Sequence, residues 1–228
     1  FANTPLFLLD RLETFTRRED EIKIIASLKA SYDITDNITF NTSFGADFTD
    51  ETFLRSEAPN SFNALLFAQT GNETPGFEDR DSSRSIFLNF NNNLNYRNTF
   101  NEKHTVDVSL FTEYFKAHWR SFGYTAEGLD PATYYPGDGS AYIDDNAAND
   151  NFVDSARANI QNAGLFSYFA YADYDYDTKY GFTATVRRDA SYRFADSNKW
   201  GTFWSVAGRW NISNESFMQD VSWVNSLK

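Results

Sequence analysis

The stretch KYGFTATVRRDASYRF, Lys179 to Phe194, contains the pattern that decides the fold of this chain. Its first half alternates apolar and polar side chains, so that Phe182 and Val186 share one face of an extended backbone. A period of two residues is typical of a β-strand with two unlike faces. Its second half gathers three arginines around a single aspartate, Asp189, in a chain that is otherwise acidic.

The same alternation recurs along the chain and predicts about seven strands, in the ranges 22–33, 38–48, 86–96, 106–114, 166–174, 182–187 and 202–212. In 86–96 it slips once, at Asn92. Tight turns are expected near 33–37, 97–103 and 177–179, whereas long polar loops are expected at about 55–82 and 120–160. Short turns at one end and long loops at the other are typical of outer-membrane β-barrels.

Composition excludes several classes of protein. The net charge of −12 argues against nucleic acid as a partner, because phosphate binding needs a basic surface. The absence of cysteine excludes disulfides and thiolate sites. Aromatic residues make up 18% of the chain, yet the mean hydropathy is only −0.55, which indicates rings that alternate with polar residues.

No apolar run is long enough for a membrane helix, but barrel strands leave only a weak hydropathy signal. Seven strands would leave open sheet edges, and open edges cannot face lipid. We therefore expect an all-β fold, with residues 1–228 forming one partial domain of a large antiparallel transmembrane β-barrel. No helix longer than about two turns is expected, and residues 1–20 are poorly patterned.

Aromatic side chains lie near the expected short turns, where an interfacial girdle of a barrel belongs. They are Tyr32, Tyr96, Tyr174, Tyr180 and Trp210. The alternative is ordinary cross-strand packing of rings in a β-sandwich.

The segment from Lys179 to Ser213 resembles the signature strand pair of the SusC/RagA family of TonB-dependent outer-membrane transporters. The matching residues are Tyr180, Arg188, Asp189, Ser191, Arg193, Phe194, Trp200, Gly201, Phe203, Ser205 and Trp210. The departures are Ala190 for a usual glycine, Trp204 for proline and Arg209 for a small residue. The segments YDITDNITFNTSFGADF and GYTAEGLDPATYY also resemble the barrel hairpins and loops of the family.

This resemblance implies a barrel of 22 strands in the outer membrane of a Gram-negative cell, filled by an N-terminal plug that this chain lacks. It implies import of an oligosaccharide or peptide nutrient, energised through TonB. Expected partners are outer-membrane lipid, a SusD-like surface lipoprotein, and TonB through the N-terminal region that is missing. The ligand itself stays undetermined.

At the rim of such a barrel, Arg188 and Arg193 are expected to brace Asp189 as charge-assisted pairs that fix the hairpin 189–199. This structural role is favoured over contact with substrate or with the phosphate of lipopolysaccharide.

No enzymatic or metal site stands out. The loop 136–150 holds Asp138, Asp144, Asp145 and Asp150, but their spacing does not match an EF-hand, so a solvated loop is favoured over calcium and no cofactor is expected. His104 and His118 are expected near opposite ends of one strand, which disfavours a shared metal. No catalytic motif is present, and the chain is not expected to be an enzyme.

Aromatic residues crowd the second long loop, namely Trp119, Phe122, Tyr124, Tyr134 and Tyr135. Rings of this kind can stack on sugars, but packing of the loop or contact with a partner protein is favoured here.

Three alternatives to a transporter stay open. A SusC-like barrel without transport could serve as a structural scaffold in a larger outer-membrane assembly. A soluble carbohydrate-binding β-sandwich would fold without detergent. An outer-membrane enzyme would need a catalytic cluster at the rim.

Overall fold

The computed structural model describes residues 4–67, 75–139, 141, 154–218 and 220–228. Most of them belong to the strands β1 (Phe15–Thr35), β2 (Ile38–Glu57), β3 (Phe77–Phe100), β4 (His104–Glu127), β5 (Ser155–Tyr176), β6 (Tyr180–Ser191) and β7 (Trp200–Trp210). The helices are α1 (Thr4–Thr14) and α2 (Phe62–Phe67), and the 3-10 segments are η1 (Asp196–Asn198), η2 (Ile212–Asn214) and η3 (Ser216–Met218).

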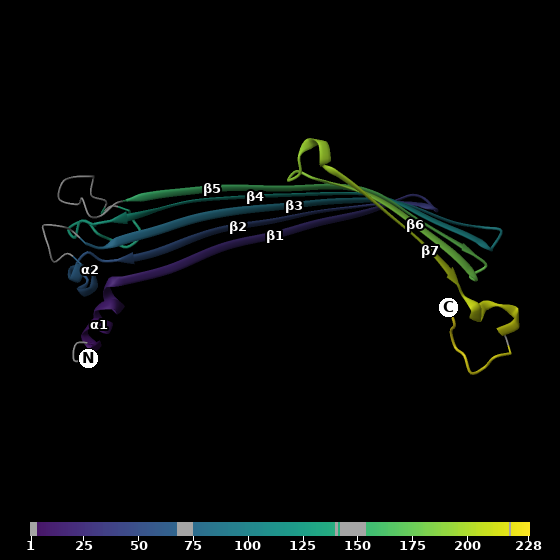
Figure 1. Ribbon diagram of the computed structural model, residues 1–228, viewed down its shortest axis with the longest axis horizontal. Coiled ribbons are helices and arrows are strands. Elements are labelled where there is room, and N and C mark those ends of the chain that lie inside the picture. Colours follow the sequence, from purple (N-terminus) through teal and green to yellow (C-terminus); the bar gives the residue numbers. More distant parts are fainter. Residues whose placement is uncertain (1–3, 68–74, 140, 142–153, 219) are drawn as a thin grey trace. The chain divides into compact units, whose positions relative to one another are not determined.

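The seven strands form one antiparallel sheet in sequence order, β1-β2-β3-β4-β5-β6-β7 (Figure 1). This up-and-down order confirms the predicted fold class, a segment of a large antiparallel barrel. Within the described residues there is a single sheet with no second sheet packed on it, so the sandwich alternative is wrong.

Several strands run well beyond the alternating patterns. β3 and β4 each contain 24 residues, and the first loop spans only residues 58–76 between β2 and β3. Cross-strand charged pairs accompany the added length; for example, Arg84 donates to both carboxylate oxygens of Asp50, at 3.2 and 3.3 Å. Because both faces become polar there, the period-two signal in the sequence stops before the backbone ladder does.

The expectation that no helix exceeds two turns is wrong, because α1 contains 11 residues. Pro5 suits the first turn of a helix, and the block LFLLDRL consists largely of good helix formers. Asp10 also accepts a hydrogen bond from the backbone nitrogen of Phe62 in α2, at 2.9 Å. The apolar residues of α1 are contiguous rather than periodic, which hid the helix from pattern analysis.

The chain divides into two compact units, each considered by itself below. Unit 1 comprises Phe1–Ile24, Phe48–Ile86 and His118–Gln161; unit 2 comprises Ile25–Asp47, Phe87–Ala117 and Asn162–Lys228. Unit 1 has a small buried core around Leu54, Ala126 and Leu129. In unit 2 the large apolar side chains are mostly exposed, which is the reverse of a water-soluble core.

Candidate functional site

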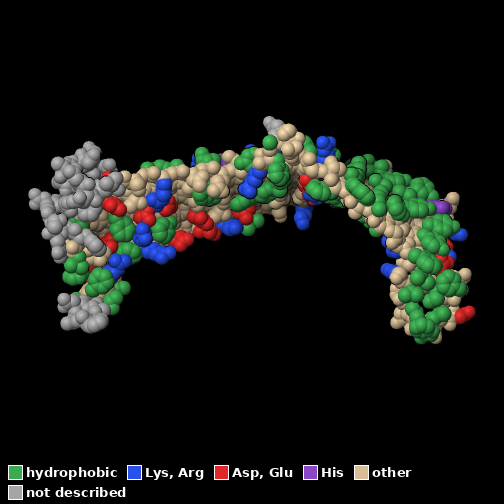
Figure 2. Space-filling view, in the orientation of Figure 1, with side chains coloured by type: hydrophobic (Ala, Val, Ile, Leu, Met, Phe, Trp, Pro, Cys, Tyr) green, Lys and Arg blue, Asp and Glu red, His purple; other side chains and the backbone are tan. Residues whose placement is uncertain are grey.

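The sheet of unit 2 has one apolar and one polar face. The register pairs Phe182 with Tyr174 and Gly208, and Val186 with Ala170 and Trp204, so the even-numbered residues of these strands share a face. That face is exposed, with 76% of Trp204 and 59% of Val206 accessible. Hydrophobic side chains gather on the surface of the part of the chain that contains β6 and β7 (Figure 2). An extended apolar surface of this kind needs an apolar environment such as lipid.

A row of rings crosses the apolar face at the short-turn end. Tyr180 stacks between Tyr176 and Trp210, with centroid distances of 6.4 Å to each. The ring of His104 lies 4.9 Å from that of Tyr176, and its Nδ1 is 2.7 Å from the hydroxyl oxygen of Tyr174. The structure thus groups three of the predicted girdle residues, Tyr174, Tyr180 and Trp210, in one row.

A second row of rings, not anticipated from the sequence, lies at the other end of β6. It consists of Phe166, Tyr168 and Trp200; the ring of Trp200 is 6.2 Å from Phe166 and 5.5 Å from Tyr168. The signal that could have revealed it was the second matching set of aromatic residues, one strand length from the first.

The separation of the two rows matches a bilayer. The pairs Tyr180–Trp210 and Ala190–Trp200 are ten residues apart along β6 (190 − 180). Ten residues of strand span about 33 Å, and a strand tilt near 40° reduces this to roughly 25 Å, the height of the apolar band of outer-membrane barrels.

Asn92, where the alternation slips, lies on the apolar face but is not left unsatisfied. Its side-chain oxygen accepts from the hydroxyl of Thr42 at 2.9 Å, and its amide donates to the hydroxyl of Thr112 at 3.0 Å. Hydrogen bonds between these three side chains therefore link three neighbouring strands. They lower the free-energy cost of placing an amide among apolar residues.

The opposite face of unit 2 is polar and contains a hollow of about 550 Å³. Its lining includes Lys29, Ser31, Asn41, Ser43, Asn91, Asn93, Phe111 and Glu113. Amides, hydroxyls and an aromatic ring are groups that can hydrogen-bond and stack on a polar ligand.

The predicted charge cluster is arranged differently from the expectation. Asp189 pairs with Arg187, whose Nε lies 2.7 Å from the carboxylate, and the same guanidinium donates to Glu113 at 2.7 Å and to Ser167 at 3.1 Å. It also lies 4.7 Å above the ring of Phe169. Arg187 and Asp189 share the polar face because they are two residues apart.

Arg188 and Arg193 do not join that cluster. Arg188 lies on the apolar face, where its Nη1 donates to the hydroxyl of Tyr168 at 3.2 Å and its guanidinium lies 5.0 Å from the ring of Trp200. Arg193 lies in the connection between β6 and β7 and makes no ion pair with Asp189 among the described residues.

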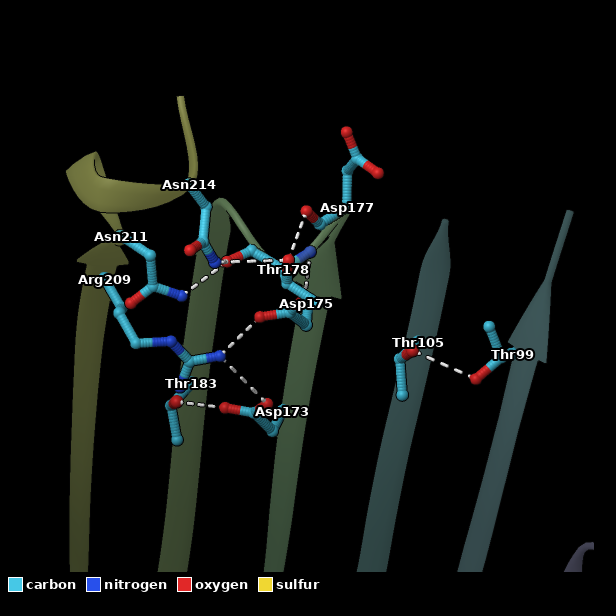
Figure 3. A network of polar contacts seen from close by, with 10 residues as sticks. All are labelled: Thr99, Thr105, Asp173, Asp175, Asp177, Thr178, Thr183, Arg209, Asn211 and Asn214. Carbon is cyan, nitrogen blue, oxygen red and sulfur yellow. Dashed lines mark hydrogen bonds and ion pairs between the residues drawn. The ribbon is translucent and has the colours of Figure 1, made fainter. Parts of the chain in front are cut away.

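A polar network ties the end of β7 to the turn between β5 and β6 (Figure 3). Arg209 donates to Asp175 at 2.6 Å and lies 3.8 Å from a carboxylate oxygen of Asp173. The side-chain amides of Asn211 and Asn214 donate to the carbonyl oxygen of Thr178, at 2.6 and 2.8 Å. Arg209, which departs from the family signature, thus has a structural role.

In unit 1, hydrogen bonds hold part of the second long loop against the strands; we call this set of contacts around Glu78 the latch. Glu78, only 3% exposed, accepts from the hydroxyl of Tyr124 at 2.6 Å and from the backbone nitrogen of Gly137 at 2.8 Å. The hydroxyl oxygens of Tyr134 and Ser56 are 2.8 Å apart, and burial raises the pKa of Tyr134. Gly137 has φ of 84°, and a Cβ there would approach Leu54 to 2.7 Å.

The four residues predicted for a ligand or partner loop therefore separate. Tyr124 and Tyr134 pack against the cluster of Ala126, Leu129 and Ala141 and hold the loop. Trp119 and Tyr124 lie on β4 rather than in a loop. Tyr135 is 68% exposed, which leaves it able to contact a partner.

The described residues contain no group of three or more His, Asp or Glu side chains that could hold a metal ion. Of the acidic loop considered for calcium, Asp144, Asp145 and Asp150 lie outside the described residues. Among the described residues, no helix is long and apolar enough to cross a membrane.

Comparison with known proteins points to one group. The chain is 29% identical over 199 residues to the TonB-dependent receptor P39 of Formosa agariphila, covering 87% of this chain and 18% of that protein. Over 64 residues it is 45% identical to the TonB-dependent receptor SusC of Bacteroides thetaiotaomicron, covering 28% of this chain and 6% of SusC. No protein-family model matches the chain.

Among solved structures, the fold is similar to that of the RagAB peptide transporter, with a TM-score of 0.76 at 19% identity over 91% of this chain and 22% of that one. The RagAB peptide importer in its open-open state gives a TM-score of 0.74 at 18% identity, covering 91% of this chain and 21% of that one. The chain thus spans about a fifth of the length of P39 and of these structures.

A sheet with an exposed apolar face, aromatic rows at both ends of that face and a polar opposite face is the wall of a transmembrane β-barrel. Its location is the outer membrane. In sequence and fold the chain is similar to a barrel segment of TonB-dependent receptors of the SusC/RagA type.

Proposed function

We propose that the protein to which this barrel segment belongs imports a glycan or peptide nutrient across the outer membrane, with energy supplied through TonB. The observation that carries the proposal is the two-faced sheet of unit 2. One face suits lipid, and the other offers the amide-rich hollow around Asn91 and Phe111 to the barrel interior. The names of its relatives, TonB-dependent receptors and a peptide transporter, support this class of activity.

We propose a SusD-like lipoprotein as the surface partner, docking on the loops of unit 1. The latch around Glu78 supports this, because it holds the described part of the loop in one conformation and leaves Tyr135 exposed. A pre-ordered loop loses less conformational entropy on binding. The proposal includes no resident metal or cofactor, so chelation of calcium should leave uptake unchanged.

The test starts with the full-length protein, extracted from source membranes in mild detergent. A heat-modifiable band that co-purifies with a surface lipoprotein, and nutrient uptake that stops when TonB is deleted, are the expected results. Co-purification with assembly machinery, without uptake, would instead support the scaffold alternative. A fully water-soluble product would overturn both.

A further inference from the structure

Arg188 is an exposed cation on the apolar face of β6. The register pairs it with Tyr168 on β5 and Thr202 on β7, and Val186 and Ala190 flank it on its own face. Its guanidinium contacts are the hydroxyl of Tyr168 and the ring of Trp200. An arginine always carries its charge at the pH of a cell, so a full positive charge faces the membrane here.

No carboxylate among the described residues forms an ion pair with Arg188. The nearby acids Asp189 and Glu113 belong to the polar face, where both pair with Arg187. A cation on the lipid-facing side of a barrel is costly at mid-membrane and much less so at the interface. The charge of Arg188 therefore needs a partner from outside the chain, at the depth of the lipid headgroups.

The surroundings of Arg188 fit that depth. Trp200 and Tyr168 belong to the second aromatic row, and such rings mark the level of the headgroups. Beyond the row, Tyr192 and Phe194 are 52% and 62% exposed, and Arg193 is a second exposed cation within five residues (193 − 188). Among the described residues no carboxylate pairs with Arg193 either.

We infer that Arg188, together with Tyr168 and Trp200, forms a binding site for the phosphate group of a phosphorylated glycolipid in the membrane leaflet at this end of the strands. The planar guanidinium can donate two parallel hydrogen bonds to a phosphate. Its position over Trp200 limits its rotation, so that it is oriented before the lipid arrives. The acyl chains would then lie along the exposed apolar surface of Val186 and Trp204. This goes beyond the proposed import, since it concerns the outside of the barrel wall.

The site can be tested with the full-length protein in detergent, by native mass spectrometry against monophosphoryl lipid A. We expect Arg188→Gln to weaken lipid binding roughly tenfold or more, because it removes a charge-assisted contact. Arg188→Lys keeps the positive charge but lacks the planar guanidinium that can donate two parallel hydrogen bonds. This variant should therefore weaken lipid binding less. The matched control is Arg97→Gln, which removes the same charge at the short-turn end and should leave binding unchanged.

Two results would overturn the inference. One is binding of lipid A by Arg188→Gln at the wild-type level. The other is competition by inorganic phosphate at concentrations comparable with the lipid, which would make this a site for free phosphate. Arg188→Gln is used only if it folds, which a heat-modifiable band reports. If that band is absent, lipid binding is measured instead with Arg188→Lys and Trp200→Phe, since both keep a bulky side chain at their position. In that case, unchanged lipid binding in both of these variants takes the place of the first result.

Discussion

Arg187 and Arg188 are adjacent in sequence and differ in every contact. Arg187 joins two carboxylates and a phenylalanine ring on the polar face, whereas Arg188 meets only a tyrosine hydroxyl and a tryptophan ring on the apolar face. The separation follows from the alternation of side chains along a strand. A one-residue shift in register would therefore exchange a structural cation for a membrane-facing one.

Replacing Arg187 with methionine should destabilise the barrel by about 1 kcal/mol, a value kept small because the pair is partly exposed. The change leaves Glu113 and Asp189 without their shared cation. The measurement is the midpoint of urea unfolding of the full-length protein in detergent. Arg188→Met is the control and should leave this midpoint unchanged; an equal loss in both variants would refute the assignment.

Tyr134→Phe should loosen the latched part of the second loop. The substitution removes the hydroxyl that meets Ser56, a residue with no exposed surface, at a cost of about 1 kcal/mol. Limited proteolysis should then cut between residues 128 and 141 faster than in the wild type. Tyr135→Phe, at a position 68% exposed, should not change the cleavage rate.

Glu215 should make the segment after β7 sensitive to acid. Hydrogen bonds from Tyr180 and Trp210 lower the pKa of Glu215 below its unfolded value. A depressed pKa in the folded state stabilises the protein fully above the unfolded value, about 4.3, and the contribution disappears as the pH falls through the folded pKa. Hydrogen exchange of residues 211–218 should rise in that window, and Glu215→Gln should abolish the pH dependence.

At the scale of elements, two of the short turns, between β3 and β4 and between β5 and β6, contain residues in a strained backbone conformation. Asn101 and Glu102 have φ of 49° and 58°, and Asp177 and Thr178 have φ of 53° and 58°. Positive φ at both central residues is typical of two-residue hairpin turns that match the twist of the flanking strands. Glutamate and threonine are poor choices for that conformation, where glycine or asparagine is usual.

Glu102→Gly should therefore raise stability by about 0.5 kcal/mol, the relief of the left-handed conformation less the extra entropy of glycine in the unfolded chain. Thermal loss of the heat-modifiable band is a suitable measurement. Lys103→Gly, at a position without positive φ, should be neutral or destabilising. A lower melting temperature for Glu102→Gly than for Lys103→Gly would contradict this account of the turn.

At the scale of the whole molecule, the decisive property is which face of the sheet meets lipid. Ser205 and Val206 are both exposed neighbours on β7, and they differ chiefly in the face to which they belong. The chain contains no cysteine, so a single introduced cysteine reports on its own position within this segment.

In the full-length protein in membranes, Val206→Cys should react with a lipid-soluble maleimide, and Ser205→Cys with a water-soluble one. The two cysteines should therefore differ in which of the two reagents labels them faster. Equal labelling of both cysteines by the water-soluble reagent would contradict a barrel wall in the membrane.

Much of this molecule could be predicted from local patterns. The alternation in KYGFTATV, the turns and the aromatic residues near them predicted seven antiparallel strands with two unlike faces, because side-chain direction along a strand has a period of two. Where the period faded, prediction failed: α1 was missed, and β3 and β4 extended past their expected ends. The domain boundaries and the roles of the loop residues stay predictions.

The sequence by itself determined which side chains share a face of the sheet, since side chains at alternate positions of a strand lie on the same side. Only the tertiary structure decided which partners meet across strands. Arg187 pairs with Asp189 and Glu113, Arg188 meets Trp200, and Asn92 is satisfied by Thr42 and Thr112. These contacts depend on the exact register between strands, because a shift of one residue moves every side chain of a strand to the other face, and the paired strands show which residues lie opposite one another.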